Sequence, residues 1–594
     1  MNGLIGFRTA QEVAAILRAT PSRIKSILGR LADSARLMTV RRDPIAIEAV
    51  QSARPVTEDP FRAARDTIGD LFDAKFYRQL NDDVRLAGID PLQHYLEFGW
   101  REGRDPSPGF DTRYYLTQNP DVADSGENPL VHFARIGAAE GRQPMPVDFA
   151  RERIVSARSP REQVKDWLRP SDPQVLGREE LRERLAEFGA NDADAIMVSL
   201  SHDEYATVAG GVQNCIGNEA AIFAEMGWLY LHACPAQPLP NLAEKVAGAS
   251  FNLILTANGR RVAGELQFSD LADELAALRR KGSRLWLVVH HLLGHAPELV
   301  AEMGRLVGPG RTIVWIHDYF TLCPNWVLLR NDVEFCHAPP VSSTACEICC
   351  YGEERRIHLN RMRAFFDALE PIVLSPSRLA LDFWREHSRL RHATAAVVPP
   401  CEVGFGAHPR SVATGDKGEG PHRIAFIGSA TYLKGWQVFE ELARLHRGDP
   451  RYEFYELNAR RRSKFAHVRH VLVDVGPKDR LGMVTALIEN QIDIVLLWSL
   501  CSETFSFTTH EAIAAGVAII TRQGAGNIAA AASAIAPEQV WILENEEELF
   551  VKFGSGCVRD LAAANNRQRG TLTFGGHTAD YLRLAAQSAL VNDV

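Results

Sequence analysis

The sequence has no long hydrophobic run, no excess of positive charge and few cysteines for its 594 residues. A membrane-spanning helix needs about 20 consecutive apolar residues, whereas the runs AIAAGVAII and LWLVVHHLLG suit only buried strands or helices. The net charge of -8 argues against nucleic acid as a partner, because such binding depends on neutralising phosphates. Ten cysteines are too few to form a disulfide scaffold.

What is present is typical of a globular chain with several domains. Apolar residues make up 46% and charged residues 24%, and the length exceeds that of one hydrophobic core. The first residues, MNGLIGFRTAQEVAAILRAT, lack the basic region, apolar stretch and cleavage site of a secretory signal. We therefore expect a cytoplasmic protein.

Residues 9–38 predict one or two helices, with apolar residues at one- or two-turn intervals and basic residues among them. Such a helix could lie on an anionic membrane surface, which would place the protein peripherally at the inner membrane. The alternative is a docking helix with a solvated face. Both interpretations stay open.

A 38-residue segment occurs twice in tandem, beginning at Phe72 and at Phe110. In each copy an aromatic pair opens one helix, Asp-Pro or Asn-Pro opens another, and a Glu-Gly-Arg turn closes the unit. His94 and His132 occupy matched positions beside aromatic and leucine neighbours, which favours structural histidines over ligands. We expect two copies of a helix-turn-helix unit.

Apolar runs with strand character alternate with helical stretches in two series, AIMVSLS to AAVVPP and HRIAFIGSA to VAIITR. This alternation predicts two doubly wound α/β domains that bind ligands where the parallel strands end. The predicted organisation is a helical segment and linker (1–60), tandem helical repeats (61–150), a linker (151–190) and two Rossmann-like domains (191–405 and 406–594).

The most specific motif is SLCSETFSFTTHEAIAAGVAIIT, in which seven residues separate Glu503 from Glu511 after the apolar run IDIVLLW. It resembles the Glu-x7-Glu element of retaining GT-B glycosyltransferases of the sucrose synthase-like and mannosyltransferase-like family. The tandem repeat likewise resembles modules at the ends of some bacterial glycan-assembly transferases, where contact with an acceptor or partner is a hypothesis. The resemblance implies a GT-B fold for residues 195–585.

The same resemblance implies roles for the residues of this motif. Glu511 would bind the ribose hydroxyls of a nucleotide diphosphate sugar, and Glu503 would face the donor sugar. The helix that begins near Thr508 and Thr509 would direct its amides to the diphosphate, so that no metal is required for catalysis. The alternative is an acidic helix N-terminus that favours only the helix dipole.

Two glycine-containing turns are expected to face the donor. In RIAFIGSATYLKGW the turn holds Gly428 and Lys434, and the resemblance implies contact with the diphosphate. Ser429 stands where the family usually has Arg, which puts donor affinity in question. Gly210 and Gly211 resemble the family's Gly-Gly loop after the first strand, where the backbone approaches a phosphate or sugar.

His317 and Asp318 follow the apolar run RTIVWI and resemble the family's strand terminus at the cleft. His317 would hydrogen-bond the donor sugar or acceptor hydroxyl, with Asp318 orienting it or helping to deprotonate the acceptor. The alternative is a structural His317, because His290 and His291 follow another strand and compete for the role.

Half of the cysteines lie within one short segment. Cys323, Cys336, Cys346 and Cys349 could close a tetrahedral structural zinc site, whereas their irregular spacing also suits reduced, partly buried thiols.

The sequence therefore predicts a hexosyl- or deoxyhexosyltransferase with a nucleotide diphosphate sugar donor and a surface polysaccharide, lipid-linked glycan or protein acceptor. Retention would suit a front-face reaction that depends on positioning and electrostatic stabilisation. The alternative is a catalytically inactive GT-B-like scaffold that recruits glycan-assembly partners. An epimerase or phosphorylase is a third interpretation. The donor base and sugar, linkage and oligomeric state are open.

Overall fold

The computed structural model describes residues 61–145, 149–168, 174–208, 210–244, 251–406, 420–463, 465–476, 479–564, 568–575 and 577–592. The chain divides into two compact units, residues 1–69 and 70–594. The helices predicted for residues 9–38 lie outside the described residues, and the described part of the first unit contains α3 (Arg62–Ile68). Among the described helices, none has both the length and the apolar character needed to cross a bilayer.

The tandem segments have matching elements after η1 (Gly69–Leu71). In one copy these are α4 (Ala74–Leu80), α5 (Asp82–Ala87), α6 (Pro91–His94) and the π-helical η2 (Tyr95–Gly99). In the other they are α7 (Thr112–Gln118), α8 (Pro120–Ser125), α9 (Pro129–His132) and the π-helical η3 (Phe133–Gly137). Each copy thus has three short helices and a π-turn, more than the expected helix-turn-helix.

The histidines of the two copies have the same structural environment. Tyr77 Oη lies 3.0 Å from His94 Nδ1, and Tyr115 Oη lies 2.9 Å from His132 Nδ1. Both imidazoles are buried. Because a buried polar atom is costly without a hydrogen bond, these pairs explain the recurring tyrosine and histidine as structural residues.

The first Rossmann-like domain has a nine-stranded sheet in the described residues, in the order β11-β10-β7-β6-β1-β2-β3-β4, with β5 paired to β3. The strands from β11 to β2 are parallel, whereas β3 pairs antiparallel with β2. Their bounds are β1 (Ala195–Leu200), β2 (Leu229–Pro235), β3 (Asn252–Ala257), β4 (Arg260–Arg261), β5 (Leu266–Gln267), β6 (Arg284–Val289), β7 (Thr312–Trp315), β10 (Ile372–Ser375) and β11 (Thr394–Val397). The run FNLILTA therefore forms an antiparallel strand beside a parallel sheet.

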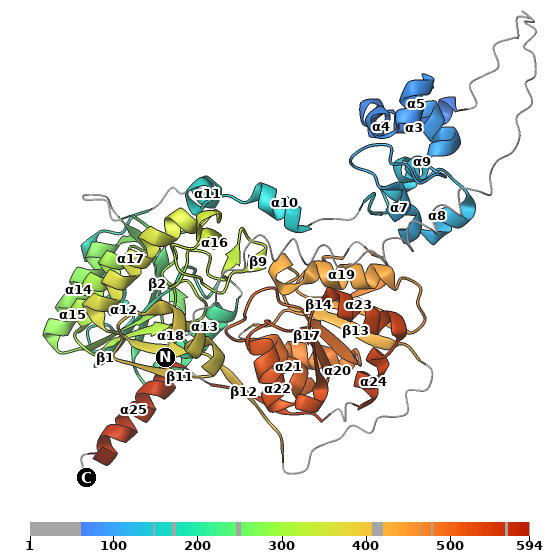
Figure 1. The fold of residues 1–594 in the computed structure, drawn as a ribbon. Helices are drawn as coiled ribbons and strands as arrows, with labels where there is room; N and C mark the ends of the chain where they lie inside the picture. The colour runs from blue at the N-terminus through green and yellow to red at the C-terminus, as the bar shows by residue number, and fades with distance from the viewer. Residues whose placement is uncertain are drawn as a thin grey trace, which may run out of the picture. The chain divides into compact units, whose positions relative to one another are not determined.

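Helices cover both faces of this sheet (Figure 1). One face packs on α12 (Arg178–Glu187), α14 (Phe268–Lys281), α15 (Pro297–Val307), α17 (Gly352–Leu369) and α18 (Arg378–Ser388). The other packs on α13 (Gly211–Glu225) and α25 (Thr578–Asn592). The remaining elements are α10 (Phe149–Ser156), α11 (Pro160–Trp167), α16 (Thr344–Glu347) and the hairpin β8 (Leu329–Arg330) and β9 (Glu334–Phe335).

The described residues of the second Rossmann-like domain form a six-stranded, fully parallel sheet in the order β15-β14-β13-β16-β17-β18. The strands are β13 (His422–Ile427), β14 (Tyr452–Asn458), β15 (Val468–Leu472), β16 (Ile494–Leu497), β17 (Ala518–Arg522) and β18 (Val540–Leu543). This is the doubly wound order, with its crossover point between the first and fourth strands.

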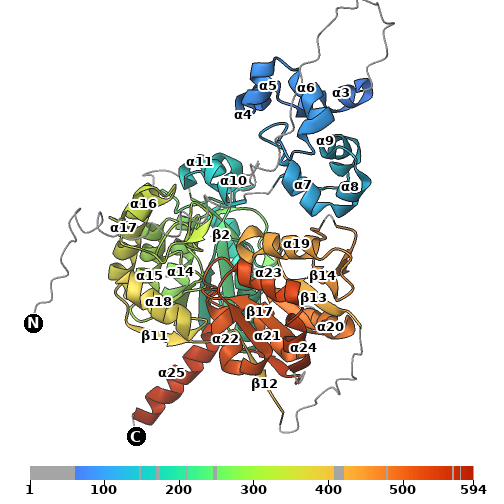
Figure 2. The same cartoon turned by 45° about the vertical axis from the view of Figure 1, so that its right-hand side comes forward.

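Helices again pack on both faces of this second sheet (Figure 2). One side has α19 (Trp436–Leu445), α23 (Glu546–Ser555) and α24 (Val558–Ala564). The other has α20 (Gly482–Glu489), α21 (Phe507–Ala515) and α22 (Asn527–Ile535). Two turns, η4 (Tyr432–Lys434) and η5 (Pro537–Gln539), and an antiparallel pair, β12 (Cys401–Gly404) and β19 (Thr571–Phe574), complete it.

The predicted α/β class with two Rossmann-like domains is confirmed, but three segments pack differently from their predicted domains. Strand β12, expected at the end of the first domain, pairs with β19 and packs against α21 of the second. Helix α12, expected in the linker, contributes Leu181 and Leu185 to the core of the first domain. Helix α25, expected in the second domain, buries Ala579 in the core of the first. The chain therefore passes through the second domain and returns to the first.

Candidate functional site

A cavity of about 440 Å³ lies between the two Rossmann-like domains. Its walls come from segments that follow β7, β13 and β16 and from the start of α13, which places it at the carboxyl ends of the parallel strands. The predicted site residues among those lining it are Gly211, His317, Gly428, Lys434, Glu503 and Thr508. The chain thus brings six of the predicted residues together from both domains.

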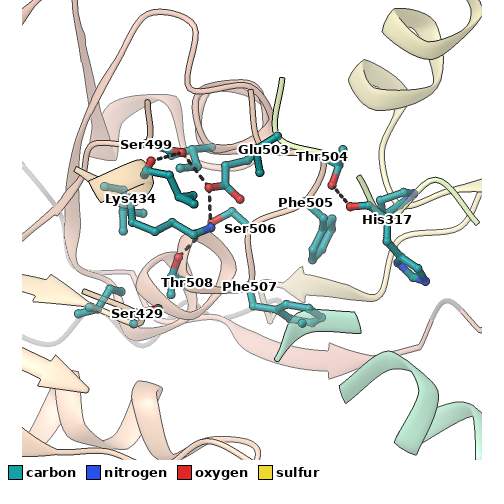
Figure 3. A pocket seen from close by; sticks show the side chains of 18 of the residues that line it. His317, Ser429, Lys434, Ser499, Glu503, Thr504, Phe505, Ser506, Phe507 and Thr508 are labelled. Carbon is teal, nitrogen blue, oxygen red and sulfur yellow. Dashed lines mark hydrogen bonds and ion pairs between the residues drawn. The ribbon is translucent and has the colours of Figure 1, made fainter. Parts of the chain in front are cut away.

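The wall from the second domain carries an ion pair. Lys434 Nζ lies 2.5 Å from Glu503 Oε1, which also accepts a hydrogen bond of 2.8 Å from Ser499 Oγ (Figure 3). Burial lowers the pKa of Lys434, but the Glu503 carboxylate outweighs burial and the net shift is upward. The Lys434 side chain keeps 40% of its surface exposed, so its charge can still meet an anion in the cavity. Within the described part of the chain, Lys434 is the single Lys or Arg of this lining.

The turn that carries Lys434 needs glycine at both ends. Gly428 has φ +84, and a Cβ there would lie 3.1 Å from Thr508 Cγ2. Gly435 has φ +79, and a Cβ there would lie 2.1 Å from the carbonyl oxygen of Trp498. Side chains rarely adopt this backbone conformation, and the second contact is sterically forbidden. Ser429 lines the cavity at the position where the resemblance implies Arg.

Helix α21 begins at the cavity with a serine cap. Ser506 Oγ accepts a hydrogen bond of 3.2 Å from Thr509 N, and Thr509 Oγ1 donates to Ser506 Oγ at 2.8 Å. Thr509 is fully buried and supports the cap, whereas Thr508 lines the cavity and lies 3.1 Å from Ser506 through its hydroxyl. The positive end of the helix therefore points towards the cavity, with one of the two predicted threonines facing it.

Glu511 lies one helical turn beyond Phe507 and Thr508, on the same side of α21, and is outside the residues that line the cavity. The residue is 4% exposed, and no hydrogen-bond or ion-pair partner among the described residues contributes to the pKa of its carboxyl. Burial raises its pKa from 4.5 to about 7. A buried carboxyl without a partner is costly in a native protein, unless a ligand supplies the missing donors.

The wall from the first domain consists of stacked rings that follow β6 and β7. The ring of His317 is nearly parallel to that of Trp315, with centroids 4.9 Å apart, and its Nε2 lies 2.9 Å from His290 Nδ1. Burial and the neighbouring His290 hold the pKa of His317 well below its usual value, so the ring is neutral. Thr504 of the second domain donates a hydrogen bond to the His317 carbonyl oxygen, which joins the two walls.

Asp318 faces a second cavity, of about 540 Å³, that shares Trp326 with the first. Leu293 N donates to His291 Nδ1 at 2.9 Å, so the proton of a neutral His291 is on Nε2, which lies 2.9 Å from Asp318 Oδ2. Asp318 Oδ1 accepts from Phe320 N at 2.9 Å. Residues from α11 to the loop between β7 and β8 line this cavity: Asp166, Trp167, Leu168, His202, Asp203, Pro238, Leu239, His291, Leu293, Asp318 and Trp326.

Gly210 precedes α13 with extended backbone and is outside the lining of either cavity, whereas Gly211 lies next to Phe507 across the first cavity. Sequence reasoning missed Trp326, Thr504 and the buried Glu219. For Glu219, the sequence offers one indication, which is a glutamate on the otherwise apolar face of α13.

The four predicted zinc ligands line one small cavity of about 20 Å³. Arg355 Nη1 donates to Cys346 Sγ at 2.8 Å, and burial raises the pKa of the Cys336 thiol. Among the described residues, no group of three or more His, Cys, Asp or Glu side chains is arranged to hold a metal ion. The cysteines are thus gathered around one point without a ready set of ligands, and the structural zinc stays a prediction.

Comparisons with known proteins yielded matches to solved structures. No family model and no curated protein matches the chain. Sucrose-phosphate synthase from Thermosynechococcus elongatus is 12% identical with a TM-score of 0.39, covering 63% of this chain and 92% of that one. HepE from Anabaena, in complex with UDP-glucose, is 12% identical with a TM-score of 0.36 and the same coverages, 63% and 92%. WaaG, a glycosyltransferase involved in lipopolysaccharide biosynthesis, is 14% identical with a TM-score of 0.38, covering 62% and 94%. The function of this chain is therefore inferred from its own residues.

Proposed function

We propose that this protein transfers a sugar from a nucleotide diphosphate sugar to an acceptor hydroxyl. The observation that carries the proposal is the cavity between the domains, where Lys434 and the N-terminus of α21 face His317. A lysine and a helix N-terminus suit a diphosphate, because both place positive charge at the oxygens that become the leaving group. No metal is needed for this role.

Glu511 supports the nucleotide part of the proposal. An ionised carboxylate accepts two hydrogen bonds from a vicinal diol, and the ribose of a nucleotide offers such a diol. The buried Glu511 carboxyl has no other partner among the described residues. Binding a ribose would supply donors and bring its raised pKa back down.

The second cavity is the proposed place of the acceptor. It adjoins the first at Trp326 and offers the ring of Trp167 together with Asp318 and His291. A hydroxyl-rich acceptor fits such a lining, because indole faces pack on sugar rings and carboxylates accept from hydroxyls. A surface polysaccharide, a lipid-linked glycan or a protein could carry that acceptor. Transfer would proceed with retention, the leaving diphosphate taking the acceptor proton.

A thermal-shift screen of the full chain against UDP, GDP, dTDP and CMP tests the proposal. A ligand at one hundred times its dissociation constant stabilises a protein by about 2.7 kcal/mol. We expect one diphosphate to stabilise the protein, with a clearly smaller shift in Lys434→Ala and Glu511→Ala. Stabilisation by none of them would favour the inactive scaffold, which Ser429 in place of Arg already makes the leading alternative.

A further inference from the structure

Glu219 of α13 is a buried carboxylate behind the first wall of the cavity, and its partners come from three parts of the chain. Its Oε1 lies 3.2 Å from His290 Nε2 and accepts from Tyr230 Oη at 3.0 Å. Its Oε2 accepts from Thr578 N, at the start of α25, at 3.0 Å. The residue is 1% exposed, and its position makes the returning C-terminal helix part of the site.

These contacts determine where the protons lie. Burial raises the pKa of Glu219, but interaction with His290 and hydrogen bonds from Thr578 outweigh burial, and the net shift is downward. Whatever the charge of His290, Glu219 accepts from Tyr230 Oη and Thr578 N, and these two donors favour its ionised form. An ionised carboxylate can only accept, so His290 Nε2 must donate. In a neutral imidazole the other nitrogen is then an acceptor, and His290 Nδ1 must receive a proton from His317 Nε2, 2.9 Å away.

We propose that Glu219 and His290 are positioning residues that hold the proton of His317 on Nε2, so that its Nδ1 accepts a hydrogen bond from a hydroxyl of the donor sugar. Glu219, His290 and His317 form what we call the imidazole relay. His317 lines the donor cavity, and its Nδ1 has no partner among the described residues. The position of the His317 proton is inferred from the ligand-free protein alone, whereas the contact with the sugar rests on the proposed function.

The direction of the relay determines which ligands the wall accepts. With the proton on Nε2, His317 presents a lone pair, which suits a hydroxyl donor. If His290 carried two protons, it would donate to His317 Nε2, and His317 would present an N–H instead. The two arrangements have opposite hydrogen-bond polarity at one position and are distinguishable by measurement.

Long-range proton–nitrogen NMR on the full chain with labelled histidine tests the tautomers without any ligand. His317→Gln and His290→Gln variants assign the two signals. At pH 8 we expect the proton of each ring to lie on Nε2. A proton on Nδ1 of His317, or an imidazolium signal from His290, would overturn the proposal whether or not the protein binds a nucleotide sugar.

A double-mutant cycle tests the effect on the sugar, with UDP-glucose against UDP and GDP-mannose against GDP as probes. Glu219→Gln offers a single oxygen to Thr578 N and His290 Nε2, so it breaks or inverts the relay. We expect it to weaken nucleotide-sugar binding about 10-fold relative to the bare diphosphate, the effect of one lost hydrogen bond. His317→Ala should have the same effect, and the double variant should lose no more than His317→Ala alone.

Glu274→Gln is the matched control. Glu274 is also a buried glutamate of the first domain, but it pairs with Arg178 and Arg182. We expect this variant to lower stability and leave the ratio of sugar to diphosphate binding unchanged. Additive losses in the double variant would show that Glu219 acts independently of His317, and an equal loss in the control would show that it acts only through stability. If no diphosphate of the thermal-shift screen and neither pair of probes binds the wild type, the proposed function fails while the NMR result still decides the tautomers.

Discussion

The two walls of the cavity between the Rossmann-like domains differ in the polar groups that they present. The wall from the second domain relies on charge, with Lys434 half exposed beside Glu503 and a helix N-terminus next to it. The wall from the first domain relies on the neutral ring of His317, which stacks on Trp315 and whose Nε2 lies 2.9 Å from His290 Nδ1. A charged wall suits the diphosphate that all such donors share, and a neutral hydrogen-bonding wall suits the sugar in which they differ.

We expect the largest effect from Gly435→Ala, which disturbs the backbone of the turn that carries Lys434. Gly435→Ala places a methyl group 2.1 Å from the Trp498 carbonyl oxygen at φ +79, so we expect more than about 3 kcal/mol of lost stability and a displaced Lys434. Urea unfolding measures the loss. Gly448→Ala is the control, because Gly448 has φ +80 with no atom within 4 Å and should lose only about 1 kcal/mol. Equal losses would contradict the steric account.

Glu511→Gln tests the buried carboxyl through pH. The folded protein holds the Glu511 proton up to about pH 7, whereas the unfolded chain releases it near 4.5. Stability should therefore fall as pH rises between these values, by about 3 kcal/mol at most, and level off above them. The variant should lack this fall in pH-dependent thermal unfolding. An unchanged pH profile would show that Glu511 keeps an ordinary pKa.

Lys434→Ala removes the positive charge of the charged wall and so tests whether that charge binds the diphosphate. A hydrogen bond to a charged group contributes about 1.5–3 kcal/mol, so nucleoside diphosphate binding should weaken about 10- to 100-fold. Calorimetry with the diphosphate found in the thermal-shift screen measures this loss. Lys552→Ala removes another lysine of the same domain, which pairs with Glu548 at 3.5 Å, and should leave binding intact.

The smallest expected effect concerns the support of the neutral wall. Thr578 Oγ1 accepts from Trp315 Nε1 at 3.0 Å, and both residues are buried. Thr578→Val should cost about 1 kcal/mol in urea unfolding and leave diphosphate binding unchanged. The exposed Ser555→Ala serves as the control. A large loss of diphosphate binding in Thr578→Val would contradict the separation of the two walls.

The charged wall is easier to predict from sequence than the neutral wall. Its residues lie in two continuous segments, and the strands β13 and β16 that precede them are plain apolar runs. The amino-acid pattern alone therefore places the turn of Lys434 and the start of α21 at a sheet edge. The same pattern predicts that Thr509 faces the donor, but its hydroxyl is used in the serine cap.

The neutral wall depends on contacts that a linear sequence does not display. His290 and His317 meet because β6 and β7 are neighbouring parallel strands, and Glu219 reaches them from α13. From the sequence, these histidines are only alternative candidates for the hydrogen bond to the donor sugar or acceptor hydroxyl. The return of α25 to the first domain, which supplies Thr578, has no local signal because the preceding chain belongs to the second domain.

The most direct test of the central claim is release of nucleoside diphosphate from a panel of UDP-, GDP- and dTDP-sugars, with glycan extracts as acceptors. We expect one donor class to yield free nucleoside diphosphate and a glycosylated acceptor with the wild type, and at least about tenfold less of both with Lys434→Ala. Binding and release with none of the donors would contradict it, as would equal release by the variant.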